Sequence, residues 1–146
     1  MSPQPILIIE DSPEDYEATT RALRKAGLAN PIFHCGDGED GLDFLYQRGS
    51  YAVLDRAPRP AVILLDLNLP GADGREVLAE IKGDDGLKNI PVIVLTTSTD
   101  ERDIEKCYHG GANSYVKKPV DLPGFIRSVQ HLKDYWFEVV ILPKRG

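Results

Sequence analysis

The sequence predicts an α/β protein with a doubly wound, parallel five-stranded sheet, a (βα)5 arrangement. Four short apolar runs without polar alternation end at residues 9, 65, 95 and 116, which is typical of strands covered on both faces. Segments with apolar residues at helical spacing separate these runs. Alternating strands and helices favour βαβ units with right-handed crossovers, and therefore a sheet between two layers of helices.

The strands are expected where the chain is most continuously apolar. In chain order they lie near residues 5–10, Pro31–Cys35, Ala61–Asp66, Pro91–Thr96 and Asn113–Val116. Residues 49–60, which include Pro58 and Pro60, predict a long loop before the third strand.

Each strand is followed by a segment with the pattern of an amphipathic helix. In chain order these helices lie near residues 13–26, 38–48, 74–83, 100–109 and 121–134. Ser12 can cap the first helix, Pro13 suits its first turn and Gly27 ends it. Asp100 opens the fourth helix and Gly110 ends it. Five such units predict a flavodoxin-like strand order, 2-1-3-4-5.

The composition is that of an ordinary globular domain. A length of 146 residues suits one domain, and contents of 42% hydrophobic and 27% charged residues are typical. No apolar stretch could span a membrane, and the N-terminus lacks the features of a signal peptide. Cys35 and Cys107 lack a metal-binding spacing and are expected to be reduced thiols. We therefore expect a cytoplasmic protein.

The charge distribution argues against nucleic-acid binding. The formal net charge is −6, and the 17 lysines and arginines are scattered rather than aligned. Acidic residues instead gather near one expected edge of the sheet: Glu10, Asp11, Glu14, Asp15 and Asp66. Such a place would attract a cation.

Chemically useful residues follow the four apolar runs: Glu10 and Asp11, then Asp66, then Thr96, then Lys118. The carboxyl ends of parallel strands meet at one edge, so these side chains are expected to lie together. Two carboxylates about 5 Å apart repel by roughly 3 kcal/mol at an effective dielectric near 20, so the cluster requires cations. Lys118 can supply one positive charge. The all-oxygen ligand set favours Mg²⁺, with Mn²⁺ also suitable, for the rest.

Asp66, at the end of the central strand, is the predicted nucleophile. A carboxylate can accept a phosphoryl group and become an aspartyl-phosphate. Such a transfer depends on positioning and charge neutralisation more than on acid–base chemistry. Lys118 and the metal would neutralise the phosphoryl oxygens, and Thr96 would donate its hydroxyl to one of them. Each of these side chains alone is more often structural, so the prediction depends on their joint placement.

Four motifs occur in order along the chain: Glu10-Asp11, DLNLPGADG at residues 66–74, PVIVLTT at residues 91–97 and YVKKP at residues 115–119. Together they resemble the receiver domain of two-component response regulators, over residues 5–134. Each motif alone is weak, but the combination is specific.

This resemblance implies a role for each matching residue. Asp66 would be the phosphoacceptor. Asp11 and Asp66 would bind Mg²⁺ through their side chains, and Asn68 would bind it through its backbone carbonyl. Glu10 occupies a position where many members have aspartate, and it would act mainly through a metal-bound water.

The resemblance also implies a switch. Thr96 would be the switch hydroxyl, Tyr115 the aromatic switch and Lys118 the active-site lysine, preceding a cis peptide bond to Pro119. Phosphorylation would draw Thr96 inward, let Tyr115 turn and change the surface formed by the fourth helix, fifth strand and fifth helix. A plain core role for Tyr115 is the alternative.

The long loop and the apolar ending resemble one subgroup, the small regulators paired with bacterial and cyanobacterial phytochrome histidine kinases. Residues 1–134 would form the receiver, and residues 135–146 would be a C-terminal extension that forms a homodimer. The expected dimer residues are Trp136, Phe137, Val139 and Ile141. A tail folded back on its own core is the alternative. No helix-turn-helix fits after residue 134, so a stand-alone regulator with output through protein contact is expected.

Two other function classes share part of this pattern of residues. A phosphatase of the haloacid dehalogenase type also uses a strand-end aspartate, but it needs a second aspartate two residues later, where this chain has Asn68. A receiver-like module that binds partners without being phosphorylated would not need the complete set of reactive side chains. Both classes are therefore less favoured than a phosphoacceptor that is not an enzyme for other substrates.

Overall fold

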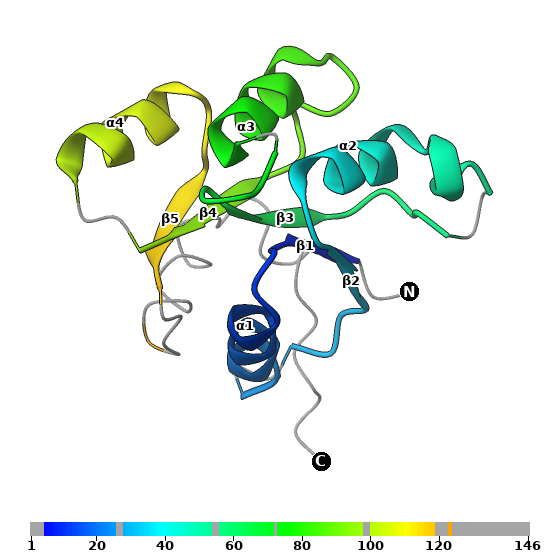
Figure 1. The fold of residues 1–146 in the computed structure, drawn as a ribbon, viewed down its shortest axis with the longest axis horizontal. Helices are drawn as coiled ribbons and strands as arrows, with labels where there is room; N and C mark the ends of the chain where they lie inside the picture. The colour runs from blue at the N-terminus through cyan, green and yellow to red at the C-terminus, as the bar shows by residue number, and fades with distance from the viewer. Residues whose placement is uncertain are drawn as a thin grey trace.

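The computed structural model describes residues 5–25, 28–53, 56–71, 73–97 and 100–118, together with Pro123. Its strands are β1 (Ile6–Ile9), β2 (Ile32–Cys35), β3 (Val62–Asp66), β4 (Val92–Thr96) and β5 (Ser114–Lys117). They form one parallel sheet in the order β2-β1-β3-β4-β5 (Figure 1). The predicted fold class and strand order are confirmed.

The three central strands are the most deeply buried. Every residue of β1, β3 and β4 is buried, as expected for apolar runs without polar alternation. The edge strands β2 and β5 carry half-buried and exposed residues as well.

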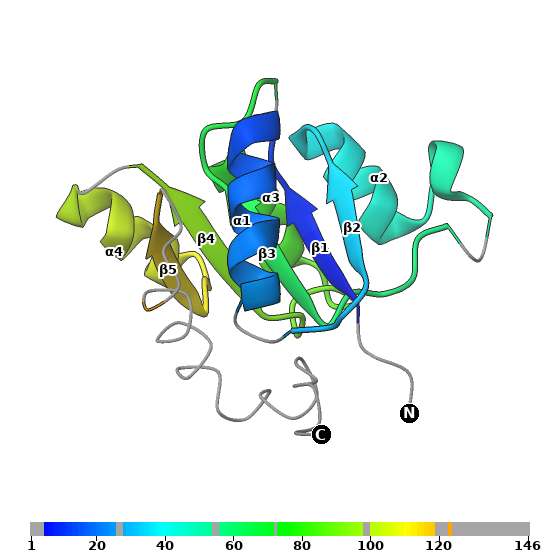
Figure 2. The same ribbon diagram turned by 90° about the horizontal axis from the view of Figure 1, so that it is seen from below.

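The helices cover both faces of this sheet. They are α1 (Pro13–Lys25), α2 (Gly38–Tyr46), α3 (Gly74–Gly83) and α4 (Glu101–His109), with a short 3₁₀ turn, η1 (Gly49–Tyr51). Helix α1 lies on one face, and α2, α3 and α4 lie on the other (Figure 1). Seen from the side of α1, this helix crosses in front of the sheet (Figure 2). Each face has its own buried apolar cluster, so the sheet separates two cores.

Side-chain caps fix where the helices begin. The Ser12 hydroxyl accepts a hydrogen bond from the backbone N–H of Asp15 at 3.2 Å, as its predicted capping role requires. The carboxylates of Asp37, Asp73 and Asp100 cap α2, α3 and α4 in the same way. The predicted start of the helix at Asp100 is therefore confirmed.

The second helix is shorter than expected. It ends at Tyr46 rather than near residue 48, because Gln47 adopts a left-handed conformation with φ of 54°. The predicted loop over residues 49–60 begins with the 3₁₀ turn η1. The expected helix over residues 121–134 and the helix stop at Gly27 lie outside the described residues. None of the helices in the described ranges has the length and apolar character needed to cross a bilayer.

Candidate functional site

The carboxyl ends of the strands bring the predicted site residues together. Asp66 and Thr96 are the last residues of β3 and β4, and both are buried. Glu10 directly follows β1, where its N–H donates to Cys35 O at 3.0 Å. Lys118 directly follows β5, where its N–H donates to Thr96 O at 2.8 Å. Backbone hydrogen bonds of the sheet thus set the positions of these four residues.

Lys118 is the centre of a buried ion-pair cluster. Its Nζ contacts the carboxylate of Glu10 and lies 3.0 Å from Asp15 Oδ2 and 3.2 Å from Asp66 Oδ2. Lys118 is 7% exposed, Glu10 is fully buried and Asp66 is 2% exposed. With three carboxylates around one ammonium group, the cluster carries surplus negative charge.

The pKa values of Glu10 and Lys118 reflect this environment. Burial and the neighbouring Asp66 carboxylate raise the pKa of Glu10 from 4.5 to about 7, although Lys118 opposes the shift. Burial lowers the pKa of Lys118, but its contacts with Glu10 and Asp15 and the charge of Asp66 raise it more. Lys118 is therefore charged at neutral pH, whereas Glu10 is close to its titration range.

Both oxygens of the Asp66 carboxylate have defined partners. Oδ1 accepts a hydrogen bond from the backbone N–H of Asn68 at 3.0 Å, and Oδ2 faces Lys118. The turn after Asp66 packs directly on the start of α3 at Gly74. A Cβ at Gly74 would lie 2.2 Å from Asp66 O and 2.5 Å from Leu67 Cα. The position of the predicted phosphoacceptor therefore depends on a contact that excludes any side chain at residue 74.

The residues of the predicted metal site also lie together. Carboxylate oxygens of Glu10, Asp11 and Asp66 lie within 4.8 Å of one another, and Asp11 is exposed. Mg²⁺ binds oxygen ligands at about 2.0–2.1 Å and keeps several waters, so direct and water-mediated contacts within this cluster are both feasible. The donor set fits a hard divalent cation.

The two predicted switch residues lie on neighbouring strands. Thr96 is fully buried at the end of β4. Tyr115 on β5 pairs with Val94 of β4 and is half-buried against the core that α2, α3 and α4 cover. Burial and the nearby Cys107 and Asp103 raise the pKa of Tyr115, so its phenol is neutral. This position is compatible with both the switch role and the core role that the sequence left open.

Four predicted site residues and one predicted peptide bond lie outside the described part of the chain. They are the dimer residues Trp136, Phe137, Val139 and Ile141 and the Lys118–Pro119 bond. Both cysteines are buried free thiols, in agreement with the expectation from sequence.

The contact of Asp15 with Lys118 was not expected from the sequence. Asp15 was expected only as one of several acidic residues near this edge, whereas in the structure its carboxylate lies beside the ammonium group of Lys118. The cap at Ser12 was the available signal, because it starts α1 beside the site and puts Asp15 in the first turn. A second contact that sequence did not indicate is His34, whose Nε2 lies 2.7 Å from the Glu10 carbonyl oxygen and whose ring stacks on Tyr16.

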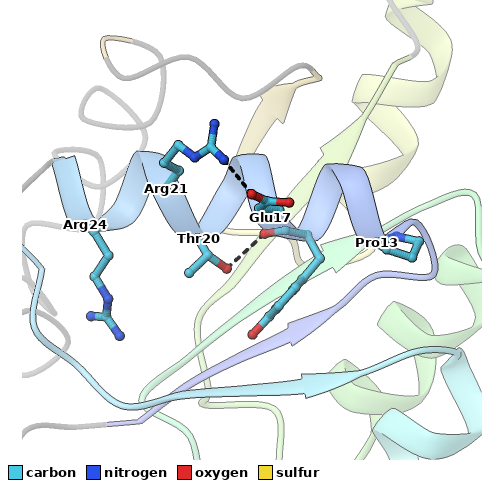
Figure 3. Close-up of a pocket in the computed structure, with 6 residues that line it drawn as sticks. Pro13, Glu17, Thr20, Arg21 and Arg24 are labelled. Atoms are coloured by element: carbon cyan, nitrogen blue, oxygen red, sulfur yellow. Dashed lines mark hydrogen bonds and ion pairs between the residues drawn. The ribbon is translucent and has the colours of Figure 1, made fainter.

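A shallow groove on α1 is separate from this cluster. It is lined by Pro13, Tyr16, Glu17, Thr20, Arg21 and Arg24 (Figure 3). Its charged side chains have local partners: Arg21 donates to Glu17 at 2.5 Å, and Arg24 donates to backbone carbonyls after the helix. The groove contains none of the predicted site residues.

The profile of the response regulator receiver domain matches residues 6–130. The chain belongs to this family. Response regulator Rcp1 of Synechocystis sp. is 43% identical to this receiver over 141 residues, which cover 97% of the chain and 94% of Rcp1. The predicted resemblance to receiver domains is therefore confirmed, and members of this family are generally non-enzymatic signalling proteins.

Three solved structures of relatives cover nearly the whole chain. The bacteriophytochrome response regulator AtBRR is 42% identical with a TM-score of 0.86, over 99% of this chain and 100% of AtBRR. The Mn²⁺-bound form of Rcp1 is 42% identical with a TM-score of 0.77, over 97% and 99% of the two chains. The phosphorylated cyanobacterial phytochrome response regulator RcpA is 39% identical with a TM-score of 0.77, over 98% and 100%. This receiver therefore resembles phytochrome-linked regulators, as its sequence predicted.

Proposed function

We propose that this receiver accepts a phosphoryl group on Asp66 from a histidine kinase and signals through protein contacts. The main support for this proposal is the ion pair between Asp66 and Lys118 at the carboxyl edge of the sheet. The two groups lie 3.2 Å apart and are nearly excluded from solvent. A lysine at this position can neutralise a phosphoryl oxygen, because its charge is already held where the new bond would form.

The proposed reaction is a single phosphoryl transfer. Oδ of Asp66 attacks phosphorus while the bond from phosphorus to the donor breaks. With a kinase phosphohistidine, the bonding electrons return to the imidazole nitrogen, which takes a proton from solvent. With acetyl phosphate, acetate leaves as a carboxylate. Thr96 donates its hydroxyl to a phosphoryl oxygen. The protein catalyses only its own phosphorylation and dephosphorylation.

The side chains of Asp11 and Asp66 and the backbone carbonyl of Asn68 would hold Mg²⁺, and Glu10 would contribute through a water. When bound, the cation supplies positive charge to the phosphoryl oxygens. The clustering of Glu10, Asp11 and Asp66 supports this assignment, and the Mn²⁺-bound form of Rcp1 supports Mn²⁺ as a substitute.

The proposed output is a population shift. A phosphoryl group adds charge and strong acceptor oxygens, which favour inward positions of Thr96 and Tyr115. Tyr115 lies on β5 at the edge of the sheet, so its movement would change the surface of α4, β5 and the segment that follows. A partner protein that binds one form of this surface would read the signal.

The proposed partner is a phytochrome histidine kinase, and the proposed location is the cytoplasm, where ATP drives kinase autophosphorylation. The near-complete coverage of Rcp1 and AtBRR by this chain supports a regulator of the same kind. Residues 135–146 are proposed to form a homodimer through Trp136, Phe137, Val139 and Ile141, because an apolar ending of this composition favours burial against a partner.

Treatment with acetyl phosphate and Mg²⁺ tests the phosphoacceptor. We expect the intact protein to gain the mass of one phosphoryl group, and we expect Asp66→Asn to gain none. Peptide mapping should place the modification at Asp66. A wild-type protein that stays unmodified with both acetyl phosphate and a panel of histidine kinases would favour the binding-only alternative.

The metal assignment has a separate test. Asp11→Asn should bind Mg²⁺ much more weakly in titration calorimetry but keep its fold, because the substitution removes a ligand and also relieves repulsion. Unchanged Mg²⁺ affinity in this variant would contradict the assignment.

The partner and the dimer are tested independently. Phosphotransfer to this receiver should be faster from a phytochrome kinase of its source organism than from other histidine kinases of that organism. Sedimentation should give a dimer for residues 1–146 and a monomer for residues 1–134. Equal monomeric masses for both chains would remove the dimer proposal.

A further inference from the structure

Lys118 has one partner that does not belong to the reactive strand ends. Its Nζ donates a hydrogen bond to Asp15 Oδ2 at 3.0 Å, across a separation of 103 residues in sequence. Asp15 lies in the first turn of α1, whereas Glu10 and Asp66, the other two partners of Lys118, lie at the ends of strands. The lysine is therefore shared between the sheet edge and a helix.

The exposure of these three carboxylates differs. The side chains of Glu10 and Asp66 are 0% and 3% exposed, whereas that of Asp15 is 45% exposed. A partly hydrated carboxylate can release Lys118 at lower cost than a buried one, because water replaces the lost contact. Among the three contacts, the one with Asp15 is therefore the easiest to break.

The backbone of Asp15 is held while its side chain contacts the lysine. Its N–H donates to the Ser12 hydroxyl, which anchors the first turn of α1. The positive end of the helix dipole also favours a carboxylate at this position. Asp15 is thus a fixed negative charge facing Lys118 beside the place where a phosphoryl group would bind.

A phosphoryl group on Asp66 would carry about two negative charges in place of the single charge of the carboxylate, and its oxygens would need the same ammonium group. Asp15 then opposes this group in two ways, by repelling it and by holding Lys118. We propose that Asp15 is a positioning residue that competes with the phosphoryl group for Lys118 and so favours the unphosphorylated state. This inference rests on the proposed phosphorylation of Asp66.

The test measures binding of beryllofluoride, a mimic of a bound phosphoryl group, in the presence of Mg²⁺. Asp15→Asn should lower the half-saturating concentration about two- to fivefold, as expected for loss of one partly exposed ion pair. It should also raise the initial rate of phosphorylation by low concentrations of acetyl phosphate, with a smaller change in the rate at saturation.

The matched control is Glu14→Gln, which makes the same change in net charge one residue away. Glu14 is exposed and accepts a hydrogen bond from the Ser12 hydroxyl, and no contact of Glu14 with Lys118 is present in the described residues. We expect the beryllofluoride affinity and the phosphorylation rate of Glu14→Gln to change by much less than those of Asp15→Asn. The conservative variant Asp15→Glu should restore values close to wild type.

Unchanged or weaker beryllofluoride binding by Asp15→Asn would overturn the inference, and so would an equal gain in Glu14→Gln. In both cases a phosphorylated wild-type protein would leave the proposed function intact. A wild-type protein that binds no beryllofluoride and accepts no phosphoryl group would instead overturn both proposals. A thermal unfolding scan of each variant separates loss of fold from these outcomes.

Discussion

Two partly or fully buried lysines lie at opposite ends of the sheet and have opposite surroundings. Lys118, at the carboxyl end, contacts the carboxylates of Glu10, Asp15 and Asp66. Lys82, at the end of α3, donates to three neutral oxygens near the amino ends of β4 and β5. They are Lys88 O at 3.0 Å, Ile90 O at 2.8 Å and Asn113 Oδ1 at 3.2 Å.

The difference separates a lysine with a proposed role in phosphoryl transfer from a structural one. Neutral oxygens satisfy the hydrogen bonds of Lys82 but do not compensate its charge, and burial lowers its pKa. Carboxylates overcompensate the charge of Lys118 and raise its pKa. Surplus negative charge around Lys118 can attract a further cation, whereas the neutral oxygens around Lys82 carry no charge that would attract one.

At each of these two ends of the sheet, one glycine is in close contact with neighbouring atoms. The neighbouring atoms differ in how easily they can move. At the reactive end, a Cβ on Gly74 would meet backbone atoms of Asp66 and Leu67 at 2.2 and 2.5 Å. At the other end, a Cβ on Gly111 would meet the flexible stem of Lys82, nearest at Cγ, 2.8 Å away. Backbone cannot give way as a lysine stem can, so the reactive end is the less tolerant of the two.

The largest expected effect is that of Gly74→Ala. We expect a loss of unfolding free energy of about 3 kcal/mol or more, because the new methyl group overlaps rigid backbone beneath Asp66, the proposed phosphoacceptor. Urea denaturation followed by circular dichroism measures it. A loss below about 1 kcal/mol would mean that the turn after Asp66 can move away from α3.

The second effect distinguishes the two lysines directly. Lys118→Ala should cost about 3 kcal/mol without Mg²⁺, because it leaves buried carboxylates without a cation, and Lys82→Ala should cost about 2 kcal/mol through lost hydrogen bonds. Millimolar Mg²⁺ should restore part of the stability lost in Lys118→Ala and none of that lost in Lys82→Ala. Only the carboxylates around residue 118 can bind a metal ion in place of the missing ammonium group.

Urea denaturation with Mg²⁺ and with EDTA checks this pair. Equal recovery of both variants would contradict the contrast between the two ends. In the same experiment, Lys118→Ala should still bind Mg²⁺ but should lose the conformational response to phosphorylation.

A smaller effect is expected for Gly111→Ala, about 1–2 kcal/mol in unfolding free energy. Gly111 has φ of 101°, which an alanine adopts only with strain, and the new methyl group must displace the Lys82 stem. If the mobile stem absorbs the overlap, the Lys82 ammonium should lose part of its hydrogen bonding. A chemical-shift change confined to the Lys82 side chain in NMR spectra would show this.

The smallest effect is a difference in titration, measured by carbon-13 NMR of the lysine Cε groups in the metal-free protein. On raising the pH, Lys82 should lose its proton below 10.5 and Lys118 should keep its proton above 10.5. Titration of Lys82 then adds stability as pH rises toward 10.5, because the unfolded chain holds the proton longer. The stability from Lys118 is present below pH 10.5 and is lost as pH rises through its raised folded pKa. The reverse order of titration would contradict the assigned surroundings.

Sequence patterns predicted the sheet and much of the site for a physical reason. In β1, β3 and β4, burial on both faces requires unbroken apolar runs, so the strands and their ends are visible in the chain itself. The placement of Glu10, Asp66 and Lys118 follows from those ends and from the parallel order of the strands. The predicted end of α2, near residue 48, was too late in the chain, because Gln47, a residue without a strong turn preference, adopts the left-handed conformation and ends the helix at Tyr46.

The amino-acid sequence by itself determined the strand order, the family and the residue types at the reactive edge. Tertiary structure decided which charges share Lys118, because the fold brings Asp15, in the first turn of α1, to a lysine 103 residues away in sequence. It also decided the surroundings of Lys82 and the close contact at Gly74. Such contacts depend on distances between segments far apart in the chain, and no local pattern of residues encodes those distances.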